Sequence, residues 1–366
     1  MDNDSDAFYN YEEDFHGNDR KISRMERKKA IEKDRSKYKK TDQDQLKKKT
    51  TPVEKISATA LRGRILGIYP EGIQVDCNEK LYRCQLKGSL KKEKQDKKNL
   101  VAIGDFVLFE PREEIHGLIF KIEPRYSILS RADNLLRRKE QLIAVNIDQV
   151  IITASISVPS LKPGLLDRYI IASQKGNMTP IIVINKIDLL PEEDKDFIDE
   201  LAKTYKNLSI AFLTISAKTG EGLDSLKKHM EGKTSVFSGQ SGTGKSSLIN
   251  ALLGSNLRTG ETTEKTLKGS HTTTTATLLP LKTGGFCVDT PGIKSFGIWD
   301  LEAKEVEFYF TEIANAALKC KFSGCSHTSE PSCFVQEALE KGEISPIRFA
   351  SYISLLETLK EKHRNR

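Results

Sequence analysis

The fold of this chain is decided by the stretch Gly239-Gln240-Ser241-Gly242-Thr243-Gly244-Lys245-Ser246. It fits G-x-x-x-x-G-K-[ST], a glycine-rich turn whose backbone N–H groups can approach phosphate oxygens closely, with the positive end of the following helix adding to the field. The context agrees, because the apolar residues 235–237 indicate a buried strand before the turn and residues 246–253 indicate a helix after it. The stretch therefore predicts an α/β sheet that holds a phosphate-bearing ligand.

Three further motifs surround this phosphate loop in an unusual order. Asn185-Lys186-Ile187-Asp188 and Ser216-Ala217-Lys218, which are typical of guanine recognition, come before it, and the metal-side motif Asp289-Thr290-Pro291-Gly292 comes after it. In an ordinary small GTPase the phosphate loop comes first. The order here results when the ends of the domain are joined and the chain is reopened after the metal-side strand, which folds tolerate because domain termini usually lie close together. A circularly permuted P-loop GTPase domain is the only interpretation that uses all four motifs.

The phosphate loop and the metal-side motif assign roles to single residues. Lys245 is expected to reach the β- and γ-phosphates, and Ser246 to bind Mg²⁺ directly. Asp289 ends an apolar strand and would hold Mg²⁺ indirectly, through water, while Gly292 can offer its N–H to the γ-phosphate. The nucleotide-binding residues predicted on this side are Gly239, Gln240, Ser241, Gly242, Thr243, Gly244, Lys245, Ser246, Ser247, Asp289 and Gly292.

Asp188 is predicted to choose the base. A carboxylate offers only acceptors, and guanine presents two adjacent donors at N1 and N2 where adenine does not. Asn-Lys-Ile-Asp would otherwise be a polar turn, but it follows the apolar run 181–184, and ligands bind at the carboxyl ends of such strands in open α/β sheets. We expect Lys186 to lie along the base, Asn185 to brace the phosphate loop, the Ala217 N–H to meet O6, and Ser216 and Lys218 to complete the base site.

A threonine run lies between the phosphate loop and the metal-side motif, in Gly269-Ser270-His271-Thr272-Thr273-Thr274-Thr275. One of these threonines is expected to bind Mg²⁺ and to sense the γ-phosphate, as in an order–disorder switch. The sequence does not choose among residues 272–275, and we name Thr273 for this role. Threonine runs also form strands, and residues 276–279 are expected to be one.

Catalysis raises a separate question, because Ile293 follows Gly292 where an ordinary small GTPase has a glutamine that orients the attacking water. Isoleucine can neither hydrogen-bond water nor accept a proton, so the unaided rate should be low. His271 is the candidate within the chain, against the alternative of a structural or RNA-facing histidine. The predicted catalytic residues are therefore His271, Lys245 and Thr273.

Six cysteines divide into two sets. Cys320-x4-Cys325-x-His327-x5-Cys333 places three thiols and one imidazole in a short polar stretch, where they can close a tetrahedral Zn²⁺ site. Disulfides are the alternative, but we expect an intracellular nucleotide enzyme without a signal peptide to be kept reduced. Four protein ligands leave no open position, so the metal should be structural. The other three cysteines are expected to be inert core thiols: Cys77, Cys84 and Cys287.

Five short alternating strands are expected near the N-terminal side, at residues 63–68, 73–77, 81–86, 105–109 and 117–122. They suggest a small Greek-key barrel of the OB kind. Such a barrel can bind single-stranded nucleic acid through a basic face with aromatic platforms, although a small barrel can also be only a structural domain. The net charge of +7 and a lysine-rich loop at residues 91–98 favour a nucleic-acid partner.

These residues resemble the permuted, ribosome small-subunit-dependent GTPases of the RsgA/YjeQ type. The resemblance covers roughly residues 52–360 and includes the nucleotide motifs, the cysteine cluster, Asn146-Ile147-Asp148-Gln149-Val150, Leu165-Leu166-Asp167-Arg168-Tyr169 and Gly269-Ser270-His271-Thr272-Thr273-Thr274. It implies that the Cys320 to Cys333 cluster binds one structural Zn²⁺ and that the small ribosomal subunit is the activator. The departures are Ser270, where the family usually has a basic residue, and the long lysine-rich loop near residue 95.

Residues 1–51 carry almost no branched aliphatic side chains and shift from acidic to strongly basic. Such a segment cannot bury enough apolar surface to offset its ordering entropy, so we expect a disordered charged tail, with a transient helix possible at residues 21–40. The tail is either a solvated segment or one that binds RNA phosphates. No run approaches the eighteen apolar residues of a membrane span, and the first residues do not fit a signal peptide, so we expect a cytoplasmic protein with no membrane partner.

The predicted organisation has four parts: a tail at 1–51, an OB-fold RNA-binding domain at 52–128, a permuted GTPase domain at 129–305 and a helical zinc-binding domain at 306–366. With the resemblance, it predicts a monomeric GTP hydrolase that uses GTP, Mg²⁺ and one Zn²⁺. It would bind the small (30S) ribosomal subunit and its 16S rRNA during late maturation and leave after hydrolysis. The alternatives are a non-catalytic RNA-binding factor that only senses GTP, and a permuted GTPase of the large subunit, although the latter lack this pairing of an OB barrel with a C-terminal Cys/His cluster.

Overall fold

The computed structural model describes residues 59–92, 100–132, 140–253, 276–289, 301–322, 324–328 and 330–364. The predicted tail at 1–51 lies outside them, as do the threonine run with His271 and Thr273, Gly292 and Ile293. No helix among the described residues has both the length and the apolar character needed to span a bilayer.

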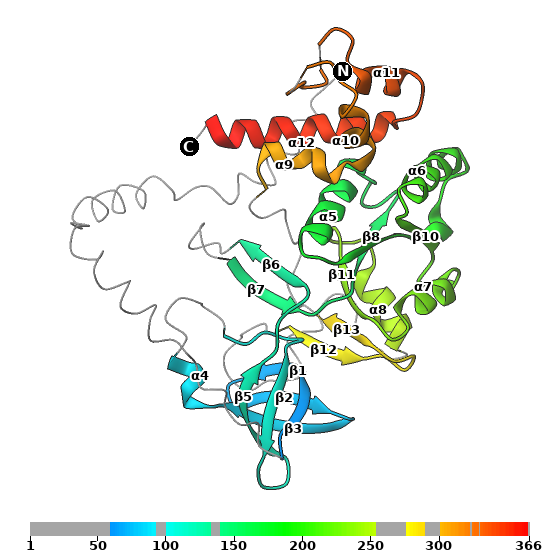
Figure 1. The fold of residues 1–366 in the computed structure, drawn as a ribbon. Coiled ribbons are helices and arrows are strands. Elements are labelled where there is room, and N and C mark those ends of the chain that lie inside the picture. The colour runs from blue at the N-terminus through cyan, green and yellow to red at the C-terminus, as the bar shows by residue number, and fades with distance from the viewer. Residues whose placement is uncertain are drawn as a thin grey trace, which may run out of the picture. The chain divides into compact units, whose positions relative to one another are not determined.

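The N-terminal strands form a closed five-stranded barrel in the order β1-β2-β3-β5-β4. Its strands are β1 Leu61–Tyr69, β2 Gly72–Cys77, β3 Lys80–Leu86, β4 Phe106–Pro111 and β5 His116–Ile122, and the short helix α4 Gly88–Lys92 follows β3 (Figure 1). Alternate residues point inward because side chains on a strand alternate between its faces, and Val75, Cys84 and Phe109 fill the interior. The pairing is antiparallel except between β3 and β5, which confirms the barrel predicted from the sequence.

A hairpin that the sequence had not indicated follows the barrel. It consists of β6 Ile128–Ala132 and β7 Glu140–Val145, which pair antiparallel as a separate two-stranded sheet. The predicted boundary between the barrel and the GTPase domain lies between residues 128 and 129. It therefore falls just after the first residue of β6 and not between two elements.

The central element is a six-stranded sheet in the order β10-β9-β8-β11-β13-β12. All neighbours are parallel except β12 and β13. The strands are β8 Gln149–Ser155, β9 Thr179–Asn185, β10 Ala211–Ile215, β11 Thr234–Ser238, β12 Thr277–Pro280 and β13 Phe286–Asp289. Every residue of β8 and β11 is buried, as expected for strands covered on both faces.

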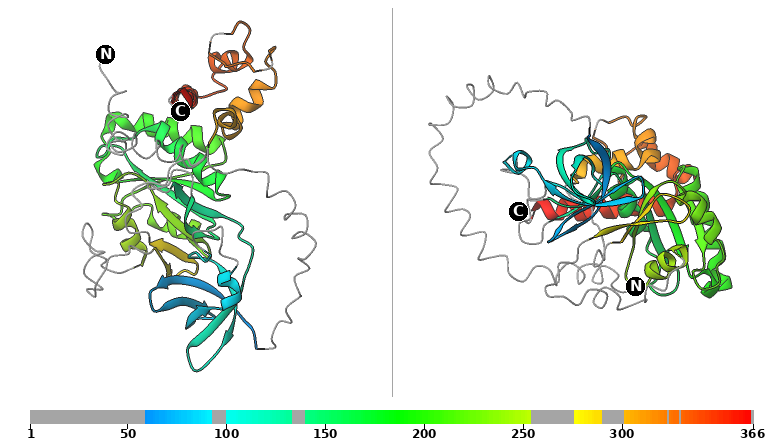
Figure 2. Two further views of the ribbon diagram at one scale, coloured as in Figure 1. Left: turned by 90° about the vertical axis from the view of Figure 1, so that its left-hand side faces the viewer. Right: turned by 90° about the horizontal axis from the view of Figure 1, so that it is seen from below.

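Helices cover both faces of this sheet (Figures 1 and 2). They are α5 Pro163–Lys175, α6 Lys195–Asn207, α7 Leu223–Met230 and α8 Lys245–Leu253, with the short helices η2 Ile187–Leu189 and η3 Glu192–Asp194 after β9. The two faces can be read from β8, where Ile152 packs in one core with α5 and α6, while its neighbour Ile151 packs in the other with α7 and α8. The sheet is therefore doubly wound, as predicted.

The described residues beyond β13, which begin at Leu301, add no strand to the sheet. They form four helices: α9 Ala303–Tyr309, α10 Thr311–Ala317, α11 Phe334–Glu340 and α12 Pro346–Arg364. They share a core that contains Val306, Phe310 and Tyr352, and α12 packs along α5 of the GTPase domain.

A buried ion network fixes the helical domain to α5. Arg348, 3% exposed, donates from Nη1 to Oδ1 of Asp167 at 2.6 Å and from Nε to Oε1 of Glu312 at 2.6 Å. The hydroxyl of Tyr205 donates to the same Asp167 oxygen at 2.9 Å. Burial alone would lower the pKa of Arg348, but the carboxylates of Asp167 and Glu312 outweigh it and raise that pKa above its ordinary value.

A second buried arginine fixes the barrel to the sheet. Arg64 on β1 donates to Oγ1 of Thr234 at 2.8 Å and to the backbone oxygen of Asn146 at 2.7 Å. Its guanidinium lies 5.0 Å from the ring centroids of both Phe106 and Phe286, one from the barrel and one from β13. The barrel therefore contacts the amino ends of β11 and β13, the strands whose carboxyl ends lead into the phosphate loop and the metal-side motif.

Candidate nucleotide and metal sites

The phosphate loop connects the end of β11 to the first residue of α8, as its sequence predicts. Two of its glycines have no room for a side chain. A Cβ on Gly239, whose φ is +145°, would lie 2.0 Å from the backbone oxygen of Thr153, and a Cβ on Gly244, with φ +87°, would lie 2.2 Å from Nδ2 of Asn185. The loop conformation therefore depends on glycine at both positions.

Lys245 extends back into the loop that it follows. Its Nζ donates to the backbone oxygens of Gly239 at 2.7 Å and of Gln240 at 2.5 Å. Burial lowers the pKa of Lys245 to about 8, because removal from water disfavours the charged ammonium. The ammonium lies within the turn that is predicted to receive phosphate oxygens, and a bound phosphate would raise the pKa again by favouring the charged form.

Asn185 joins the three motifs that the sequence separates. Its Nδ2 donates to the backbone oxygen of Thr243 at 2.9 Å, which is the brace on the phosphate loop expected from the sequence. Its Oδ1 accepts from the backbone N–H of Ala217 at 3.0 Å. That N–H was expected to meet O6 of guanine, and in this structure it is engaged by Asn185, so the contact with the base stays a prediction.

Asp188 is exposed and is held by a neighbour from the other base motif. The buried hydroxyl of Ser216 donates to Oδ1 of Asp188 at 2.6 Å and accepts from the backbone N–H of Thr219 at 3.1 Å. The carboxylate that is predicted to read N1 and N2 of guanine is thereby oriented before any base arrives. The sequence named Ser216 as part of the site but gave no sign of this hydrogen bond.

Lys186 makes another contact that the sequence did not indicate. It has φ +67° at the turn after β9, and its Nζ donates to the backbone oxygen of Val158 at 2.7 Å. Val158 lies in the loop between β8 and α5, and Pro159 of the same loop lies within 3.6 Å of where a Cβ on Gly242 would be. This loop therefore lines the nucleotide site, and no motif in residues 156–162 could have indicated it.

The metal side is described only in part. Ser246 lies exposed in the first turn of α8, and β13, which ends at Asp289, pairs with β11 through Val236 and Val288. The strand pairing thus brings the backbone of Asp289, the first residue of the metal-side motif, to the edge of the sheet at which the phosphate loop begins. The side chain of Asp289 and all of Gly292, His271 and Thr273 lie outside the described residues, and their predicted roles stay predictions.

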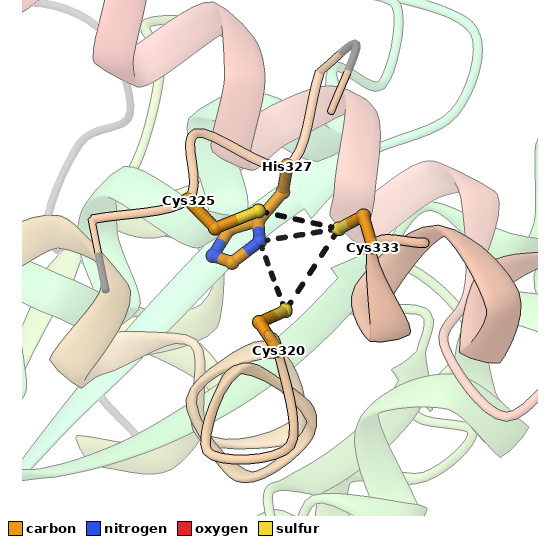
Figure 3. Close-up of side chains that lie close together, drawn as sticks. All are labelled: Cys320, Cys325, His327 and Cys333. Carbon is orange, nitrogen blue, oxygen red and sulfur yellow. Dashed lines mark hydrogen bonds between the residues drawn. The ribbon is translucent and has the colours of Figure 1, made fainter. Parts of the chain in front are cut away.

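The four predicted zinc ligands come together in the helical domain. Cys320 follows α10, Cys333 directly precedes α11, and their donor atoms with those of Cys325 and His327 all lie within 4.8 Å of one another. Figure 3 shows the four side chains pointing toward a common centre, with the imidazole Nδ1 3.5 Å from Sγ of Cys333 and 3.8 Å from Sγ of Cys320. Three sulfurs and one nitrogen at this spacing fit a tetrahedral zinc ion, and all three cysteines are free of disulfides.

The other cysteines lie apart from this cluster, as expected. Cys84 and Cys287 are buried and Cys77 is partly buried, and none of them forms a disulfide. Burial raises the pKa of Cys84 to about 12, so its thiol stays protonated and unreactive.

The strand order and the placement of the motifs define a class of protein. A doubly wound sheet carries the phosphate loop after β11, the base motif after β9 and the metal-side motif at the end of β13, with the β9 motif earliest in the chain. This arrangement is a circularly permuted P-loop GTPase domain, flanked here by a five-stranded barrel and a helical domain with a Cys/His cluster.

Comparisons with known proteins agree with this class. A family model described as RsgA GTPase matches residues 122–299. The chain is 41% identical to "Small ribosomal subunit biogenesis GTPase RsgA" of Chlorobaculum parvum over 272 residues, covering 72% of this chain and 86% of the relative. It is 38% identical to the protein of the same name from Haemophilus influenzae (strain 86-028NP) over 291 residues, covering 78% and 81%.

Solved structures show the same likeness. YjeQ from Thermotoga maritima superposes with a TM-score of 0.68 at 32% identity, covering 82% of this chain and 98% of that one. YloQ, described as a circularly permuted GTPase, superposes with a TM-score of 0.66 at 28% identity, covering 83% and 96%. The chain belongs to the RsgA GTPase family.

Proposed function

We propose that this GTPase acts in late maturation of the small ribosomal subunit, that the subunit activates its GTP hydrolysis, and that hydrolysis releases it. The observation that carries the nucleotide part is the Asn185 side chain, which ties the base motifs to the phosphate loop in one site. The proposal of a small-subunit partner is supported by the relatives, whose names describe them as GTPases of small ribosomal subunit biogenesis.

Different residues are proposed to bind the phosphates, the base and the metal ion of GTP. The backbone N–H groups of residues 240–246 and the ammonium of Lys245 bind phosphate oxygens, and Asp188 accepts from N1 and N2 of the base. Magnesium would supply positive charge that neutralises the negative charge developing during phosphoryl transfer. Ser246 and Thr273 are the residues proposed to hold it, with Asp289 acting through water, and the Gly292 N–H meets the γ-phosphate.

Hydrolysis needs help from outside the chain. Ile293 stands where a glutamine would orient the attacking water, so the free enzyme should turn over slowly. We propose that His271 positions the water, or the loop around it, once the subunit has ordered that loop. The chain after Gly292 leads into α9, which couples the γ-phosphate sensor to the helical domain.

The barrel is the proposed rRNA-binding surface. Its described strands and turns present exposed basic side chains, and one of them, Lys80, lies 5.0 Å from the ring centroid of Tyr82. Exposed lysine and arginine side chains can contact phosphates, and such contacts provide much of the affinity for RNA. In the described part of the five strands and their turns, the exposed basic residues include Arg62, Lys80, Arg83, Arg112 and Lys121.

We further propose that the Cys/His cluster binds one structural Zn²⁺ through Cys320, Cys325, His327 and Cys333. Purified protein should then contain about one zinc per chain. Cys325→Ser should lose the metal and leave nucleotide affinity largely unchanged, because the ligands lie outside the sheet that holds the nucleotide. Protein purified without chelators and found by elemental analysis to be free of zinc would disprove this site.

Single-turnover GTP hydrolysis with and without purified 30S subunits tests the function. We expect a slow reaction alone and a rise of about 10³- to 10⁵-fold with subunits, as when a partner completes a GTPase site. Lys245→Ala should abolish nucleotide binding. Absence of stimulation under every nucleotide and salt condition would favour a protein that only senses GTP.

His271 is tested at matched 30S occupancy. His271→Ala should bind GTP like the wild type and lose much of the stimulated rate. A full stimulated rate at saturation would assign His271 a structural or RNA-facing role instead.

We also propose that the protein acts as a monomer in the cytoplasm, where its proposed partner is assembled.

A further inference from the structure

We propose that Glu307 on α9 is the carboxylate partner that orients His327 for metal binding, so that the metal site is built from α9 as well as from the cysteine segment. The inference rests on the zinc site proposed above and adds a residue that supplies no metal ligand. It is carried by the geometry of the His327 ring.

The two ring nitrogens of His327 face different groups. Nδ1 faces the sulfurs, at 3.5 Å from Cys333 and 3.8 Å from Cys320, whereas Nε2 lies 3.3 Å from Oε2 of Glu307. A nitrogen that binds a metal must be unprotonated, so metal on Nδ1 requires the proton on Nε2. In that tautomer Nε2–H donates to Glu307, at the long end of hydrogen-bond distances.

Among the described residues, the hydrogen-bond partner of Nε2 is Oε2 of Glu307. His327 is 1% exposed, so water is largely excluded from it, and an unpaired N–H there would be costly. The nearby Glu330 accepts from the backbone N–H groups of Ser326 and Thr328. Among the described residues, Glu307 is the carboxylate that reaches the imidazole.

The backbone of His327 is also constrained by its surroundings. Its φ is +61°, a left-handed conformation that is uncommon outside glycine, and the side chain of Gln336 donates to its backbone oxygen. Such a conformation persists only where surrounding contacts enforce it. Glu307 thus completes a set of contacts that fix both the direction and the tautomer of the ligand.

The remaining acidic side chains at the start of α9 have other tasks. Glu302 and Glu305 form a reciprocal capping box at its first turn, and Glu305 also pairs with Lys175 at 3.7 Å. Glu307 has no such role in the helix and directs one oxygen to His327, while its side chain is 40% exposed. Carboxylate partners of this kind raise the basicity of a histidine ligand and fix its orientation.

The test is a zinc competition on the full chain, using zinc-loaded protein and a chelator of known affinity. Glu307→Ala should weaken zinc binding by about 10- to 100-fold, the effect expected when such a partner is lost. Glu307→Gln keeps an acceptor and loses the charge, so its affinity should lie between those of Glu307→Ala and the wild type. The matched control is Glu340→Ala, which removes an exposed carboxylate from α11 in the same domain and should change nothing.

Nitrogen NMR of His327 in zinc-loaded protein gives a readout that a general loss of stability would not move. We expect metal on Nδ1 and the proton on Nε2 in the wild type. Ligation through Nε2, wild-type affinity in Glu307→Ala, or an equal loss in Glu340→Ala would each overturn the role of Glu307. A wild-type chain that binds no zinc would instead remove the metal site itself, so the two failures are distinguishable.

Discussion

At the scale of single residues, base choice depends on one carboxylate and the hydroxyl that holds it. Asp188 is exposed toward solvent, and the hydrogen bond from Ser216 fixes its direction at 2.6 Å. A carboxylate that is already oriented loses less conformational freedom when the base arrives. Discrimination between guanine and adenine should therefore depend on both residues, and more strongly on Asp188 than on Ser216.

Replacing Asp188 with Asn should weaken GTP binding and improve binding of xanthosine triphosphate, whose carbonyl at position 2 can accept from the new amide. One hydrogen bond to a charged group is lost, worth about 1.5 to 3 kcal/mol, or roughly ten- to a hundredfold in affinity, and the other is weakened because the amide is neutral. Ser216→Ala should cost less, because the carboxylate remains. Nucleotide titrations of both variants measure this, and unchanged GTP affinity in Asp188→Asn would refute the assignment.

Lys245 predicts a pH dependence of nucleotide binding. Its pKa is lowered to about 8 by burial in the free protein, and a bound phosphate favours the charged form and raises it again. Binding should therefore take up a proton above pH 8, and affinity should be level below that pH and fall as the pH rises past it. Calorimetry with GDP from pH 7 to 9, in two buffers of different ionisation enthalpy, checks this. Equal affinity across that range with no buffer dependence would contradict it.

The residues that the sequence predicted well are those with a chemical reason for their spacing. Asn185 and Lys245 both contact the backbone of the glycine-rich loop, because a turn of this sequence between a strand and a helix fixes the local backbone geometry. The contacts that were missed, from Ser216 to Asp188 and from Lys186 to Val158, join residues that are distant in the chain and depend on packing. Local patterns carry no information about such pairs.

At the scale of elements, alternation and burial explain what could be predicted. The five barrel strands and the strands at β11 to β13 were expected from their apolar patterns and were found with shifted ends. The hairpin of β6 and β7 was missed. Strand β6 reads Ile-Leu-Ser-Arg-Ala, too short and too polar a pattern to distinguish from a linker. Its pairing depends on β7, which lies across a segment rich in charged residues.

The contact between α12 and α5 gives a prediction on stability. Arg348→Met leaves Asp167 and Glu312 buried without their cation and should lower the free energy of unfolding by about 3 to 5 kcal/mol. Adding Asp167→Asn should recover part of this loss, because one uncompensated charge is removed. Denaturant unfolding followed by circular dichroism measures both variants.

The matched control is Arg62→Met, which breaks an exposed pair with Glu123 whose arginine side chain is 57% exposed. Such surface pairs contribute about 0 to 1 kcal/mol. A loss in Arg62→Met as large as that in Arg348→Met would mean that burial of the Arg348 network does not govern its contribution.

At the scale of the whole molecule, charge should govern the encounter with RNA. If rRNA phosphates provide most of the affinity for the 30S subunit, raising monovalent salt from 50 to 200 mM should weaken the complex by about 10³- to 10⁵-fold for six to ten phosphate contacts. The stimulated hydrolysis rate at subsaturating subunits should fall in parallel. Intrinsic hydrolysis by the free protein serves as the control, and a complex insensitive to salt would exclude a phosphate-dominated interface.

The permuted order also decides when the nucleotide site comes into existence during synthesis. Among the strands of the six-stranded sheet, β8, β9 and β10 come first in the chain and leave the translating ribosome before the others, with both base motifs following directly after β9 and β10. The β11 edge of β8 stays unpaired until residues 234–238 emerge, and the metal-side strand follows only at residues 286–289. Because domains acquire structure as they are made, and a ligand stabilises only the form that binds it, GTP cannot assist the early half of this domain. During synthesis, the part of the domain that contains β8, β9 and β10 must therefore be stabilised by its own apolar core until the phosphate loop has been made.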